Sequence, residues 1–121
     1  MSGDTTEAGA TGGPVLIVCA DLLSGGPLVQ AVREAGRTPV RALSVAKADA
    51  AWGDAAAVLL DLTLPGAPGW LAGRPGGGPP VLSFCPHVRT DLLKAARAAD
   101  RGPVLVRSQL AAGVPEWLEA L

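Results

Sequence analysis

Residues 56–66, with the sequence AAVLLDLTLPG, carry the clearest structural signal in the chain. A run of small and branched apolar residues ends on a carboxylate, Asp61, and a Pro-Gly pair follows after three intervening residues. A strand that is buried on both faces of a parallel sheet has such an uninterrupted apolar run, whereas apolar and polar residues alternate along a half-exposed strand. The stretch therefore predicts a central strand over residues 56–61 that presents Asp61 at its carboxyl end.

Elements of the same kind are predicted on both sides of this strand. Further strands are predicted at residues 15–19, 38–42, 81–85 and 103–106. Helices are predicted from Pro27 to Gly36, from a cap at Ser44 to residue 52, from a cap at Thr90 to Gly102, and over 115–121. Strand and helix thus alternate, which implies a parallel sheet with right-handed crossovers.

The stretch between Asp61 and Val81 is dense in proline and glycine and leaves room for at most one helical turn, around Trp70. The third helix is therefore expected to be reduced or absent. Trp70 then has two alternative roles: it covers the bare sheet face, or it is an interface residue that offers this face to a partner. Trp117, in the last predicted helix, is expected to be a core residue.

Composition limits the class of protein. The chain has 121 residues, 49% of them hydrophobic and 17% charged, which is typical of one globular domain. Residues 1–13 are small and polar and predict a flexible leader, so the domain is expected over 14–121. The net charge of −1 supplies no basic field for nucleic acid. Without a signal sequence or a long apolar stretch, we expect a cytoplasmic protein that does not bind membranes.

Three segments, residues 15–18, 58–66 and 104–107, resemble the receiver domains of bacterial response regulators. The likeness extends over about residues 14–121, and its most specific element is LLDLTLPG at 59–66. The resemblance implies a flavodoxin-like, three-layer α/β/α fold with a five-stranded parallel sheet in the order 2-1-3-4-5. It also implies that Asp61 stands at the position of the phospho-accepting aspartate.

The resemblance implies further functional groups at the same sheet edge. Receivers hold Mg²⁺ with an acid pair after the first strand, and they carry a hydroxyl after the fourth strand and a lysine after the fifth. In this chain other residues stand at these positions: Cys19 and Ala20 for the acids, with Asp21 next to them, Cys85 for the hydroxyl, and Arg107 for the lysine. Placing Ser83 at the hydroxyl position would need a register slip of two residues.

These changes predict a pseudo-receiver, a module for signalling and regulation that works without phosphorylation. It would bind another protein or form a homodimer, would not be an enzyme and would need no cofactor. Asp61 would be an inert carboxylate or would pair with Arg107. The alternative is a divergent active receiver, phosphorylated on Asp61 in a two-component phosphorelay, with Asp21 and Asp61 as magnesium ligands and Arg107 in the role of the lysine.

Two other chemistries fit less well. Cys19, Cys85, His87 and Asp61 are residue types that bind zinc or form redox pairs. However, the first and fourth strands would be separated by the third and lie roughly 10 Å apart, beyond the reach of a disulfide. A flavin carrier would need a loop rich in hydroxyl groups after the first strand, and residues 19–26 lack it. No metal is therefore expected under the favoured interpretation.

Overall fold

The computed structural model describes residues 13–121. Except for Gly13, the predicted leader lies outside the described residues. Five parallel strands form one sheet in the order β2-β1-β3-β4-β5, as predicted. The strands are β1 (Pro14–Val18), β2 (Thr38–Ala42), β3 (Ala57–Asp61), β4 (Val81–Cys85) and β5 (Val104–Val106).

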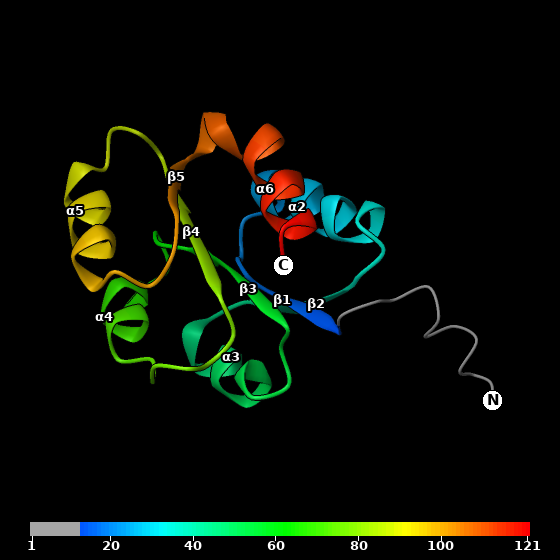
Figure 1. The fold of residues 1–121 in the computed structure, drawn as a ribbon. Coiled ribbons are helices and arrows are strands. Elements are labelled where there is room, and N and C mark those ends of the chain that lie inside the picture. The colour runs from blue at the N-terminus through cyan, green and yellow to red at the C-terminus, as the bar shows by residue number, and fades with distance from the viewer. Residues whose placement is uncertain (1–12) are drawn as a thin grey trace.

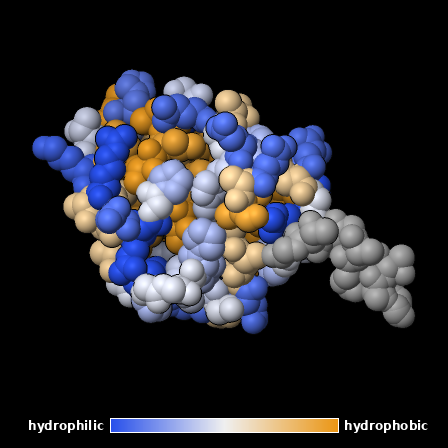
Figure 2. Space-filling model, in the orientation of Figure 1, coloured by the Kyte–Doolittle hydropathy of each residue, from blue (hydrophilic) through white to orange (hydrophobic). Residues whose placement is uncertain are grey.

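Helices cover both faces of this sheet and give the three layers visible in Figure 1. The helices are α2 (Leu22–Glu34), α3 (Val45–Trp52), α4 (Ala67–Ala72), α5 (Thr90–Ala99) and α6 (Leu110–Glu119), and a 3-10 turn η1 (Arg107–Gln109) precedes α6. One apolar core joins the sheet to α3, α4 and α5, and a second joins its other face to α2 and α6. The edge strand β5 remains partly exposed, and Figure 2 shows apolar surface between α5 and α6, where it runs.

The central strands are buried because both faces are covered. Every residue of β3 and β4 is buried, including Asp61 at 1% exposure and Ser83 at 2%. In the register of the sheet Asp61 lies opposite Phe84, so the carboxyl ends of β3 and β4 reach the same edge. The prediction from the uninterrupted apolar run is confirmed.

Two helix boundaries differ from the sequence prediction. Helix α2 begins at Leu22 rather than at Pro27, because Asp21 is extended and its Oδ1 accepts a hydrogen bond from the Leu23 amide at 2.9 Å. Pro27 then lies inside the helix, where it lacks the N–H of a normal turn. Helix α6 begins at Leu110 and contains Pro115 in the same way. In both cases proline was a misleading signal for the start of the helix.

Helix α5 also differs in its caps. Thr90 is the first helical residue and Arg89 occupies the N-cap position. The helix ends at Ala99, and Gly102 lies after its end as predicted, but the C-cap residue is Asp100, which adopts the left-handed conformation with φ of 54°. An aspartate tolerates this conformation better than most residues, so it takes over the role that the sequence assigned to glycine.

The third helix is reduced but not absent. Helix α4 has six residues and starts after Gly66, whose φ of +77° gives a left-handed turn that favours glycine. Pro68 occupies the first turn, where the missing N–H costs little. The dense proline and glycine of this region therefore shorten the helix without abolishing it.

Trp70 on α4 is buried, with 8% exposure, so the interpretation of this residue as an interface residue is corrected. Its Nε1 donates to Asp49 Oδ1 at 2.7 Å, and its ring meets Trp52 edge to face at 5.5 Å. The Arg74 guanidinium stacks 4.4 Å from the Trp70 ring centroid and contacts Asp49 Oδ1 at 2.8 Å. Trp70 thus covers the sheet face that the short helix leaves open. Trp117 is half-buried and packs against the second core.

No helix within residues 13–121 is both long and apolar enough to cross a membrane.

Candidate functional site

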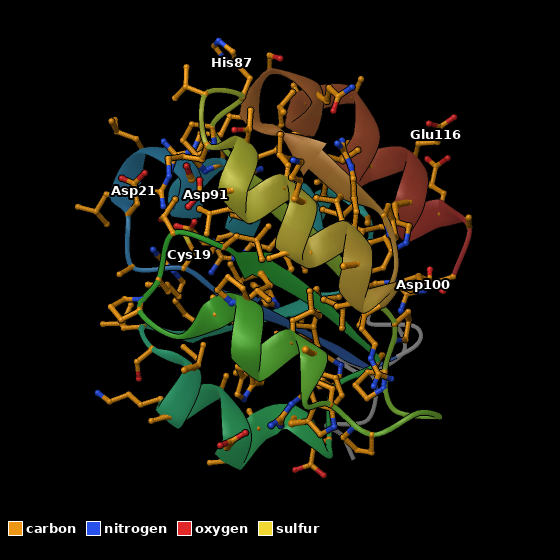
Figure 3. All side chains as sticks on the ribbon, turned by 90° about the vertical axis from the view of Figure 1, so that its left-hand side faces the viewer. Cys19, Asp21, His87, Asp91, Asp100 and Glu116 are labelled. Carbon is orange, nitrogen blue, oxygen red and sulfur yellow. The ribbon has the colours of Figure 1, made fainter. Side chains whose placement is uncertain are left out.

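The residues singled out from the sequence gather at the carboxyl edge of the sheet. Figure 3 shows Cys19 and Asp21 at this edge, with His87 on the loop after β4 pointing outward, while Asp100 marks the opposite end. Cys85 is the last residue of β4 and Arg107 follows β5 directly. The structure therefore places Cys85, and not Ser83, at the end of the strand.

The Asp61 carboxylate is held by groups of the chain itself. Its Oδ1 accepts hydrogen bonds from the Thr63 amide at 2.9 Å and from the Thr63 hydroxyl at 2.7 Å. The Cys19 thiol lies 3.7 Å from Oδ2, within reach for a weak S–H bond. A carboxylate with 1% exposure and partners on both oxygens is satisfied within the fold.

The thiol at position 19 is well suited to donate to this carboxylate. Burial is the largest effect and raises the pKa of Cys19 above its ordinary value of 9.0. The hydrogen bond to the Asp21 backbone carbonyl opposes this rise in pKa, and the nearby Asp61 charge adds a smaller upward effect. The thiol is therefore protonated at neutral pH. Burial also raises the pKa of Cys85. The two thiols belong to cores on opposite faces of the sheet, and both are free.

Arg107 pairs with Asp21, so the predicted pair between Asp61 and Arg107 is wrong. The Arg107 Nη2 lies 3.5 Å from Asp21 Oδ2, which also accepts from the Ser24 hydroxyl at 3.2 Å. The physical reason is position. Asp61 is buried below the edge, whereas Asp21 caps the start of α2 at the surface. The Arg107 side chain is 38% exposed there and reaches Asp21.

Sequence reasoning missed Arg41, which holds the loop between β1 and α2. From β2, its Nε donates to the Cys19 carbonyl at 3.0 Å and its Nη2 donates to the Asp21 carbonyl at 3.3 Å. The guanidinium lies against Gly25, where an added Cβ would clash with Nη2. A charged residue next to the carboxyl end of a predicted strand was the available signal.

Thr63 was missed as well. A residue two positions after an aspartate commonly donates its amide to that carboxylate, so the Asp-Leu-Thr sequence could have indicated this turn.

The resemblance to receiver domains implies a magnesium site at this edge, and the residues present do not fit it. Magnesium requires several oxygen ligands. Cys19 offers sulfur, Ala20 offers no side-chain ligand, and Asp21 is committed to the helix start and to Arg107. Within residues 13–121 no group of three or more His, Cys, Asp or Glu side chains is arranged to hold a metal ion. The donor set at this edge is therefore not that of a magnesium site.

A five-stranded parallel sheet in the order 2-1-3-4-5, with helices on both faces, defines the class of flavodoxin-like α/β domains. Neither a protein-family model nor a curated protein matches the chain by sequence. Solved structures do match it by fold.

A response regulator from Thermotoga maritima has a TM-score of 0.72 at 12% identity, over 88% of this chain and 94% of that chain. A putative response regulator from Chloroflexus aurantiacus J-10-fl has a TM-score of 0.71 at 22% identity, over 88% and 97%. A CheY-like receiver domain protein from Methanospirillum hungatei JF-1 has a TM-score of 0.69 at 17% identity, over 88% and 94%. The chain thus has the fold of a response-regulator receiver domain.

Proposed function

We propose that the chain is a phosphorylation-independent pseudo-receiver, a regulatory module of signalling that acts by binding protein and is not an enzyme. The observation that carries the proposal is the state of Asp61. Its carboxylate is 1% exposed, and Thr63 and Cys19 engage its two oxygens. A phospho-acceptor must instead present a free oxygen in line with the leaving group of the phosphoryl donor.

The charges around Asp61 support the same proposal. Phosphoryl transfer needs cations that neutralise the charge on the transferred group. The Arg107 guanidinium is paired with Asp21, and that of Arg41 binds backbone carbonyls. Both cations therefore stabilise the resting loop. We infer that the site works without magnesium, as its donor set suggests.

The role in signalling is inferred from the fold. The similar solved structures are described as response regulators, and one of them, Rcp1, is described in an Mn²⁺-bound form. A receiver fold with an internally satisfied aspartate would have one resting state, because no phosphoryl group would shift it to another. Regulation would then depend on the presence of its partner.

The test is exposure to small phosphoryl donors. The protein is incubated with acetyl phosphate and Mg²⁺, or with beryllofluoride and Mg²⁺, and followed by intact mass and by the amide NMR signal of Thr63. We expect no added mass and no shift of that signal. The matched control is Asp61→Asn, and a receiver domain with a complete site serves as the positive control.

A different outcome would establish the alternative function. If mass is added, or if the Thr63 signal shifts only with Mg²⁺ present and not in Asp61→Asn, the chain is a divergent active receiver. It would then belong in a two-component phosphorelay with Asp61 as its acceptor.

A further inference from the structure

A groove of about 540 Å³ lies between α2 and α6, on the sheet face opposite to Trp70. Its walls are mostly apolar and include Pro27, Leu28 and Val114. The two helices run side by side in Figure 1, and both leave the carboxyl edge of the sheet in the same direction. The groove extends from the candidate site to the far end of α2 and to the middle of α6, at Pro115.

The rim of the groove carries the most exposed leucines of the described residues. Leu22 is 78% exposed and Leu23 is 85% exposed, and Leu23 lines the groove itself. Single exposed leucines are ordinary, but Leu23 adds to the apolar lining of the groove and enlarges its apolar surface. Such a surface indicates a binding face.

The two ends of the groove carry opposite charges. Arg107 lines the end at the carboxyl edge; its side chain keeps 38% exposure beside Asp21, so it can meet a second carboxylate. Glu34, the last residue of α2, lines the other end about 18 Å away along the helix. Glu116 and Glu119 lie on the later part of α6, and Figure 3 shows Glu116 pointing outward. The cations that the sequence places at this end are Arg33 in α2 and Arg37 just after it, and the three glutamates outnumber them.

We propose that a second copy of this chain covers the groove in an antiparallel, two-fold dimer. A two-fold axis across the helices brings the Arg107 end of one protomer onto the Glu34 end of its partner, and the reverse pair forms at the same time. A surface with a cation at one end and an anion at the other is complementary to itself in this arrangement. The exposed leucines of each protomer would then be covered by its partner.

The dimer should be weak. A face of two helices, about 18 Å long and about 20 Å wide, is smaller than a standard interface of roughly 800 Å² per partner. Interfaces at this lower limit belong to transient complexes, so dissociation constants in the micromolar range are expected. The inference deepens the proposed function, since it names the partner of the module.

The experiment is sedimentation equilibrium of the full chain from about 5 µM to about 1 mM, the range that a micromolar constant requires. Leu23→Asp should weaken dimerisation at least tenfold. The substitution leaves the helix intact, because an acid is favourable in the first turn of a helix. Val88→Asp is the matched control: Val88 is 69% exposed but lies outside the groove, and its substitution should leave the dimer unchanged.

Charge reversal tests the antiparallel arrangement. Glu34→Arg alone and Arg107→Glu alone should each weaken the dimer, and the two together should restore it in part, because the reversed charge at position 107 also meets Asp21 of its own chain. A monomer at about 1 mM, a dimer that Leu23→Asp leaves unchanged, or single reversals without effect would overturn the inference. Binding of only an unrelated helix or a small apolar molecule in the groove would overturn it too. Because the readout is oligomeric state, it can fail independently of the phosphoryl-donor test.

Discussion

Cys19 gives Asp61 a neutral neighbour at the position where the receiver resemblance implies an acid. A receiver places an acid after its first strand, and an acid there would repel a second carboxylate unless a cation lay between them. The neutral Cys19 thiol, 3.7 Å from Asp61 Oδ2, removes this repulsion and can donate a hydrogen bond. A cation is then no longer needed to keep the Asp61 carboxylate buried.

The first prediction concerns alkaline pH. The folded state raises the pKa of the Cys19 thiol above 9.0, chiefly through burial. Because the thiol ionises more readily in the unfolded chain, its contribution to stability is fully present below pH 9.0 and decreases as the pH rises toward the folded-state pKa. We expect the free energy of unfolding, measured with urea, to fall more steeply above pH 9 in the wild type than in Cys19→Ala.

Cys85 serves as the internal comparison, because burial raises its pKa as well. Cys85→Ala should also reduce the alkaline slope, and the double variant should reduce it most. Equal slopes in all four proteins would mean that the thiols ionise equally in the folded and unfolded states.

At the level of elements, α2 depends on a close approach that its own sequence does not reveal. Gly25 is buried inside the helix, and its missing side chain leaves room for the Arg41 guanidinium. Glycine inside a helix normally destabilises it by roughly 0.5–1 kcal/mol relative to alanine. Here the space also permits the hydrogen bonds from Arg41 to the Cys19 and Asp21 carbonyls.

The second prediction follows from this contact. Gly25→Ala should lower the free energy of unfolding by about 1–3 kcal/mol, because Arg41 must move away and lose its charged hydrogen bonds. Gly26→Ala is the matched control, since a Cβ at Gly26 meets no atom within 4 Å, and it should stabilise by about 0.5–1 kcal/mol. Urea unfolding of both variants provides the measurement.

A double-mutant cycle shows whether the contact is the cause. In an Arg41→Ala background the obstacle is gone, so Gly25→Ala should become neutral or stabilising. If Gly25→Ala is equally destabilising with and without Arg41, the clash with this side chain is not the reason.

These elements also show what the sequence could predict. Strands β3 and β4 were predictable because their apolar runs are continuous, and the cap of α3 at Ser44 because the signal is local. The start of α2 was not, because Asp21 and Pro27 are competing local signals and the structure uses the first. The positions of Cys19, Cys85 and Arg107 at the edge follow from the parallel strands, which all end there. The contacts of Arg41 with the loop and of Arg107 with Asp21 could not be predicted, because they depend on distances that only the folded structure sets.

At the level of the whole molecule, the sheet separates two surfaces with different roles. The face with α3, α4 and α5 is covered within the chain, since Trp70 fills the space beside the short α4. The face with α2 and α6 keeps an apolar groove and two exposed leucines. The candidate site lies at the edge between them, and Arg107 belongs both to that site and to the groove. Binding in the groove would therefore act on the pair between Arg107 and Asp21.

The last prediction concerns magnesium and the stability of the whole fold. A ligand that binds only the folded state stabilises it by RT ln(1 + [L]/Kd), so about 10 mM Mg²⁺ on a site with a Kd of about 1 mM would add about 1.4 kcal/mol. For a domain of this size that corresponds to a rise in Tm of about 5 °C. Because Cys19 and Ala20 supply no oxygen and Asp21 is committed to Arg107, we expect no such rise. Calorimetry in MgCl₂ and in NaCl of equal ionic strength provides the measurement. A rise specific to Mg²⁺ that disappears in Asp61→Asn would show that Asp61 still holds a metal, and would contradict a pseudo-receiver that needs none.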